Sequence, residues 1–147
     1  MMKMAMIYQR DEHWYFQPSS KTTNGMWIAA SPLCTLDRRE SCRRKCEVAL
    51  QVLNSSRDSV PIPTDPKTLI APLLNVANVR SWAAFMRAAK CISIELDGEQ
   101  LSIIPQKKLS RPKGALESRP DDTIVVRVDA SPEEIGAALE QAMDRNS

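Results

Sequence analysis

The segment from Ser81 to Ile104 constrains the fold more than any other part of the chain, because a helical pattern passes there directly into a strand pattern. Four apolar residues recur at helical spacing behind Ser81, whose hydroxyl can accept the unpaired amide protons of a first helical turn. They are Trp82, Phe85, Met86 and Ala89. The pattern predicts a short helix that lays one apolar side on a hydrophobic core.

After position 90 the period of the pattern changes to two residues. Apolar and polar residues alternate on both sides of an Asp97-Gly98 turn until Pro105 ends the pattern, which predicts an antiparallel hairpin. We expect the apolar side of this hairpin to carry the preceding helix, with Trp82 and Phe85 as anchors. The strand residues that would receive them are Ile92, Ile94, Leu101 and Ile103.

The remaining elements follow from the same periodicities. Three strand patterns occupy the first thirty residues, with turn residues at 18–20 and 23–25, and a helical period runs from about Leu36 to Asn54. The three strand patterns lie at 4–8, 13–16 and 26–30. Pro72 is expected to limit a helical turn that begins at Asp65-Pro66.

The C-terminal region combines one strand with a strongly marked helix. Alternation from Thr123 to Asp129 predicts the strand, and Ser131-Pro132-Glu133-Glu134 combines an N-cap serine, a proline at the first helical position and a capping-box glutamate. We therefore expect a single α+β domain over residues 1–147. It would hold a mainly antiparallel sheet of five to six strands packed with three main helices.

Composition places the chain among ordinary globular proteins. It is 43% hydrophobic and 26% charged, and at 147 residues a single core can bury about 70% of the unfolded surface. Charged residues at positions 10–12 come too early for a signal sequence or a membrane span at the N-terminus. We expect a cytoplasmic protein that does not cross a membrane.

Side chains that carry catalysis are scarce. His13 is the single histidine, and its place beside Trp14 favours a packed or edge position over a catalytic one. Cys42 and Cys46 share an apolar helical stripe, where a free cysteine behaves as a small hydrophobic residue, so core packing is favoured over a metal or redox site. The four glycines are too scattered to form a phosphate-binding loop. We expect no enzymatic activity, no cofactor and no metal.

The net charge of +2 hides an uneven distribution, because residues 1–119 hold 18 Lys and Arg against 11 Asp and Glu, whereas residues 120–147 hold two against seven. Two basic sets, at 38–45 and 107–113, carry cations that can neutralise phosphates. A small nucleic-acid-binding module is therefore the alternative function. Charged helix faces are common in soluble proteins, which favours a solvated surface.

Five short motifs resemble, in their order along the chain, those of bacterial contact-dependent growth inhibition (CDI) immunity proteins. The resemblance spans about residues 24–143, and the order of the motifs carries it because each motif is structural. They are Gly25-Met26-Trp27-Ile28-Ala29, Ala49-Leu50, Arg80-Ser81-Trp82 with Phe85, Ile104-Pro105, and Ser131-Pro132-Glu133-Glu134-Ile135-Gly136-Ala137-Ala138-Leu139.

The resemblance implies a small cytoplasmic antitoxin. Such a protein binds the C-terminal toxin domain of a large exported effector and blocks its activity, which is commonly that of a nuclease. It implies a protein partner and no direct contact with nucleic acid. It transfers no binding residues to this sequence, because partner contacts vary with the toxin.

The expected partner surface comes from the pattern of acidic residues. Glu95 and Asp97 alternate with the apolar residues of the hairpin, and Glu99 lies at its tip, so they should project opposite the apolar side. With Asp121 and Asp122, they would form a negative patch that faces a basic nuclease cleft. A solvated hairpin face is the alternative.

Overall fold

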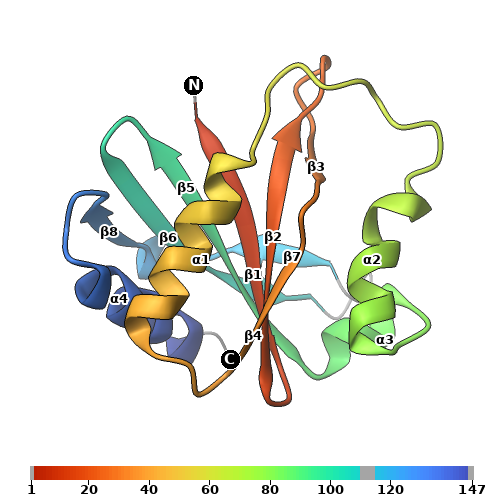
Figure 1. Cartoon of the computed structure of the whole chain (residues 1–147). Coiled ribbons are helices and arrows are strands. Elements are labelled where there is room, and N and C mark those ends of the chain that lie inside the picture. Colours follow the sequence, from red (N-terminus) through yellow and green to blue (C-terminus); the bar gives the residue numbers. More distant parts are fainter. Residues whose placement is uncertain (1, 110–114, 146–147) are drawn as a thin grey trace.

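The structure, a computed structural model, describes residues 2–109 and 115–145. One antiparallel sheet has helices on both faces, which confirms the expected α+β class (Figure 1). The strands are β1 Lys3–Arg10, β2 His13–Lys21, β3 Trp27–Ala29, β4 Cys34–Asp37, β5 Ala89–Asp97, β6 Gln100–Lys108, β7 Leu116–Ser118 and β8 Ile124–Arg127. The helices are α1 Cys42–Asn54, α2 Lys67–Ala77, α3 Trp82–Arg87 and α4 Pro132–Arg145, with a 3₁₀ turn, η1, at Pro120–Asp122.

The sheet has the order β3-β2-β1-β5-β6-β7, with β4 paired to β2 and β8 paired to β6. The predicted hairpin is present as β5 and β6, where Asp97 pairs with Gln100 and Gly98 adopts a left-handed φ of 63°. None of the helices within the described residues is long and apolar enough to cross a membrane.

Helices α1 and α4 cover one face of the sheet, which we call the first face (Figure 1). Serine hydroxyls cap both helices, since Ser41 accepts a hydrogen bond from the Arg44 backbone N–H and Ser131, the predicted cap of α4, accepts one from the Glu134 backbone N–H. The apolar side of α4 lies fully in the core, with Ile135, Ala138, Leu139, Ala142 and Met143 all buried. The strand residues beneath the two helices are Ala5, Ile7, Trp14, Phe16, Ile92, Ile94, Leu101 and Ile103.

The crossing of α1 and α4 depends on Gly136. A Cβ atom at this position would lie 2.0 Å from the carbonyl oxygen of Cys42, so only glycine permits the observed approach. Lys45, which is 3% exposed, joins the same two helices through an ion pair of 2.9 Å with Glu140 and lies 4.2 Å from the centroid of the Trp14 ring.

Helices α2 and α3 cover one end of the opposite face, the second face. The Phe85 ring is fully buried there, with centroid separations of 5.4 Å from Tyr8 and 5.8 Å from Tyr15. The expectation that Trp82 and Phe85 pack on the hairpin isoleucines was therefore wrong. Ala89, Cys91 and Ile92 are all buried, so the strand is apolar on both faces and its alternation does not select the face that α3 covers.

Two prolines lie inside strands although the sequence pattern made each a boundary. Pro18 pairs with Ala5 in β1, and Pro105 pairs with Ile92 in β5, so residues 18–20 are not a turn and β6 continues to Lys108. The Pro18 oxygen accepts from the Ala30 N–H and the Pro105 oxygen accepts from the Arg119 N–H. In an antiparallel strand, the N–H and C=O of one residue point to the same neighbouring strand. The missing N–H of Pro18 therefore faces the junction between β4 and β3, and that of Pro105 faces the junction between β8 and β7.

Three boundaries also differ from the expectation. Residues 34–37 form β4 rather than the start of a helix, because they pair with 13–16 of β2, and α1 begins only at Cys42. Helix α2 continues through Pro72 to Ala77, since Leu73 on its apolar side is completely buried and tertiary packing outweighs the helix-breaking preference. Ala89 belongs to β5 rather than to the helix before it.

We expect Gly136→Ala to destabilise the protein by about 1–3 kcal/mol or more, because the new methyl group meets backbone atoms of α1 that do not yield easily. This cost exceeds the gain of about 1 kcal/mol that alanine brings to a helix interior. Urea denaturation measures the change, with Gln141→Ala on the exposed side of α4 as the control. An unchanged midpoint for Gly136→Ala would contradict the close crossing.

We expect Phe85→Ala to cost about 3–5 kcal/mol of folding free energy, because its ring is completely buried among aromatic neighbours. Trp82 is only half-buried beside it, so Trp82→Ala should cost less. Denaturation curves of the two variants test this order. The reverse order would show that α3 is anchored through its first residue.

Candidate functional site

The end of the second face near the β5–β6 turn is open to solvent. A row of paired residues crosses it, from Met4 in β1 to Glu95 in β5, Ser102 in β6 and Val125 in β8. The first three are half-buried and the Val125 side chain is 54% exposed. We call these four residues, together with Met6 and Asp97, the open face. It is the candidate functional surface of the sheet.

Two of the predicted site residues belong to the open face. Glu95 is half-buried between Met4 and Ser102, and Asp97 is exposed opposite Gln100. Both project away from the first face, where Ile94 lies in the core, as the alternation predicts. A carboxylate beside methionine and valine side chains forms a mixed apolar and charged surface, which is typical of protein interfaces.

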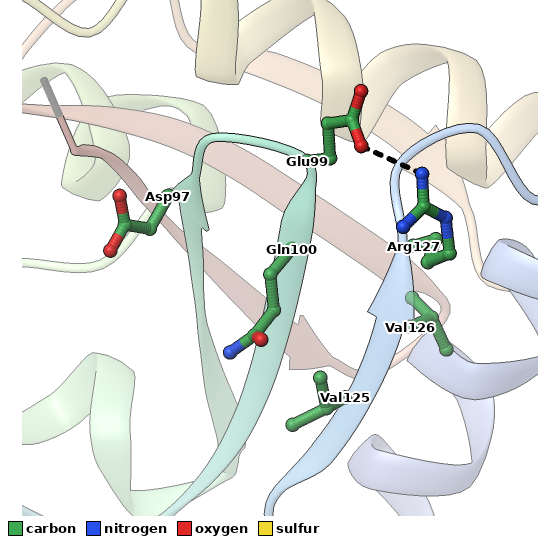
Figure 2. A pocket seen from close by; sticks show the side chains of 6 residues that line it. All are labelled: Asp97, Glu99, Gln100, Val125, Val126 and Arg127. Carbon is green, nitrogen blue, oxygen red and sulfur yellow. Dashed lines mark hydrogen bonds and ion pairs between the residues drawn. The ribbon is translucent and has the colours of Figure 1, made fainter.

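Glu99 lies at the hairpin tip and is engaged by Arg127 of β8. The Arg127 Nη2 atom lies 2.7 Å from a Glu99 oxygen (Figure 2). The Nε atom of Arg127 lies 3.0 Å from an Asp129 oxygen. The hydrogen bond from Arg127 lowers the pKa of Asp129. The hydrogen bonds to the Asp129 and Glu99 carboxylates raise the pKa of Arg127. The Glu99 charge is therefore partly offset, whereas Figure 2 shows the Asp97 carboxylate on the other side of Gln100 from Arg127.

A shallow hollow of about 290 Å³ lies between the hairpin tip and β8. Its lining residues are Asp97, Glu99, Gln100, Val125, Val126 and Arg127. Neither Val125 nor Arg127 was among the residues predicted from the sequence to lie at a functional site. The signal for Val125 was present, because three consecutive apolar residues at 124–126 of a strand must place at least one apolar side chain on each face of the sheet.

Asp121 and Asp122 are not brought to the hairpin acids. They lie in η1, before Ile124, which pairs with Ile103, whereas the tip end of β8 pairs with Gln100. Three residues of strand separate the two ends, which is about 10 Å. Asp122 also forms an ion pair of 2.9 Å with Arg119. The five predicted residues therefore form two separate groups.

Most of the described cations in the basic sets have partners within the protein. Arg39 pairs with Asp37 at 3.2 Å and Arg43 with Glu133 at 3.0 Å, in addition to the buried Lys45 pair. The Lys108 ammonium donates to the Met86 carbonyl at the end of α3. Residues 110–113 of the basic set at 107–113 lie outside the described residues.

The residues considered for catalysis are dispersed. His13 is exposed at the start of β2, with its ring 6.0 Å from that of Tyr15. Cys46 lies in the core of the first face and Cys91 in that of the second. Burial raises the pKa of the Cys91 thiol well above its ordinary value, so the reactive thiolate is disfavoured. In residues 2–109 and 115–145, no three His, Cys, Asp or Glu side chains converge as metal ligands do.

Comparison with known proteins identifies the relatives of this chain. The family described as CDI immunity protein matches residues 47–146. A protein of unknown function from Neisseria meningitidis has the same fold, with a TM-score of 0.84 at 20% identity over 100% of this chain and 96% of that one. A toxin and immunity complex from Yersinia pseudotuberculosis contains a similar chain, with a TM-score of 0.81 at 14% identity over 100% and 98%. No curated protein matches the sequence.

Proposed function

This chain belongs to the CDI immunity protein family, and on that basis we propose that it binds and neutralises the C-terminal toxin domain of a large exported effector. The family match over residues 47–146 is the observation that carries the proposal. The similarity to a chain of a toxin and immunity complex supports it. Neutralisation by binding requires no catalysis, and the dispersed histidine and cysteines agree with a protein that is not an enzyme.

The proposed toxin is a nuclease that acts in the cytoplasm, where the immunity protein meets it. A nuclease cleft is basic because it binds phosphates, so a carboxylate surface on the immunity protein would attract it and compete with its substrate. Glu95 and Asp97 on the open face, with Glu99 at its tip, provide that surface. Asp121 and Asp122 provide a second, separate acidic site at the far end of β8.

We expect the double charge reversal of Glu95 and Asp97 to lysine to weaken binding of the toxin domain at least a hundredfold, which is about 2.7 kcal/mol. Reversal replaces attraction by repulsion at the centre of the proposed interface, and the salt dependence of binding should fall with it. Calorimetric titration against the C-terminal domain of the exported protein encoded beside this chain measures the dissociation constant.

The control carries the same change in net charge on the helices of the first face. It reverses Glu47 of α1 and Asp144 of α4, both exposed, and should leave the dissociation constant within threefold of the parent value. Separate reversal of Glu99 and of the Asp121 and Asp122 pair shows which group contacts the toxin. A change of less than tenfold for Glu95 and Asp97 places the interface elsewhere, and a parent protein that does not bind the toxin domain refutes the proposed function.

A further inference from the structure

A hollow of about 500 Å³ lies at the β3 edge of the sheet, where the segment after α1 passes towards the start of α2. Its walls are mostly apolar and include Ile28 of β3, Pro61 of the segment and Leu69 of α2. Among the described residues that line it, Arg57 is the only charged one. The volume lies within the range of about 300–1,000 Å³ that is typical of ligand sites, so the hollow is large enough to hold a ligand.

The hollow is preformed, because backbone hydrogen bonds fix the segment that forms one of its walls. The Arg57 N–H donates to the Ser20 hydroxyl at 3.1 Å, and the Arg57 carbonyl accepts from the Lys21 N–H at 2.8 Å. Val60 is held in the same way, since its N–H donates to the Lys21 carbonyl at 3.0 Å and its carbonyl accepts from the Thr23 N–H at 3.1 Å. The wall therefore keeps its place without a ligand, which lowers the entropic cost of binding.

The Arg57 guanidinium is oriented by the end of α1. Its Nη1 atom donates to the Asn54 carbonyl at 2.8 Å and to the Ser56 carbonyl at 3.2 Å. Both bonds use Nη1, so Nε and Nη2 remain as the parallel pair of donors that binds both oxygens of a carboxylate. In residues 2–109 and 115–145, no carboxylate forms an ion pair with Arg57. The charge at the hollow is therefore complementary to a carboxylate of a partner.

We propose that this hollow receives the last residue of the toxin domain, with its α-carboxylate on Arg57 and an apolar side chain against Ile28 and Leu69. The inference rests on the proposed function and adds a second contact to the same complex. One terminal residue carries a free α-carboxylate and its side chain on the same Cα atom, whereas the carboxylate of an internal aspartate or glutamate has no apolar group beside it. The lining of one arginine and apolar walls therefore favours a chain end, and capture of a C-terminal carboxylate is a recurring mode of peptide recognition.

The hollow and the open face share one end of the sheet. Ala29 of β3, which follows Ile28 of the hollow, pairs with Ser19 of β2. Ser19 pairs with Met4 of the open face, which in turn pairs with Glu95. Three strand spacings, about 14 Å, therefore separate Ala29 from Glu95 across the sheet. One toxin domain can span this distance, with basic residues near Glu95 and its C-terminus in the hollow.

Arg57→Gln in the full chain tests the carboxylate contact, with the C-terminal domain of the exported protein encoded beside it as the partner. The change removes the charge and the parallel donors, so it should weaken the dissociation constant at least tenfold, about 1.4 kcal/mol. The matched control is Arg44→Gln on the exposed side of α1, which makes the same change in net charge and should stay within threefold. Urea denaturation of both variants checks that they fold as the parent protein does.

The identity of the occupant is tested on the toxin domain. Two glycines added after its last residue displace the α-carboxylate from the apolar walls and should weaken binding of the parent protein at least tenfold. The same two glycines placed before its first residue are the control and should leave the dissociation constant within threefold. In a double-mutant cycle, the C-terminal addition should have less than a threefold further effect on Arg57→Gln, because both changes remove the same contact.

A loss below tenfold for the C-terminal addition, or additive losses in the cycle, overturns the inference. A loss with Arg57→Gln alone would assign the contact to an internal aspartate or glutamate of the toxin, which also overturns it. If Arg57→Gln falls short of the urea midpoint of the parent protein, the C-terminal addition and its control decide. Binding of the parent protein in each of these cases leaves the proposed function standing, whereas absence of parent binding removes both.

Discussion

The rest of the structure depends on one constraint: β1 and β5 each contribute side chains to two hydrophobic cores, one on each face of the sheet. Ile7 and Ile92 point to the first face, whereas their neighbours Tyr8 and Cys91 point to the second, and all four are buried. Because consecutive side chains point to opposite faces, the two central strands need helices on both faces at the end of the sheet where Tyr8 and Cys91 lie. Helices α1 and α4 supply one cover, and α2 and α3 supply the other.

The second cover is short, and this gives the protein its open face. Helix α3 has six residues and meets β5 at Ala89, so it can reach only the end of the sheet where Tyr8 and Tyr15 lie. Towards the hairpin tip, positions on the second face become polar or partly exposed, beginning with Glu95 and Asp97. A sheet that is packed against helices on its first face and is uncovered on part of its second face is suited to a preformed protein interface.

The two edges of the sheet are organised alike. On each side a long strand has two short neighbours in succession, β4 and β3 beside β2, and β8 and β7 beside β6, with a proline at each junction. A proline is tolerated where no neighbouring strand requires its N–H. The short strands add width to the sheet, and β8 brings Val125 and Arg127 to the hairpin tip.

The sequence by itself determined the elements whose signals are local. The caps at Ser81 and Ser131 depend on neighbouring residues, and so does the hairpin turn at Gly98. The alternation also placed Glu95 and Asp97 opposite the apolar side. Only the tertiary structure decided which face α3 covers, since β5 is apolar on both, and that Pro18 and Pro105 lie inside strands, since this depends on distant neighbours. It also set Asp121 and Asp122 apart from the tip, because such distances follow from strand order rather than from any spacing along the chain.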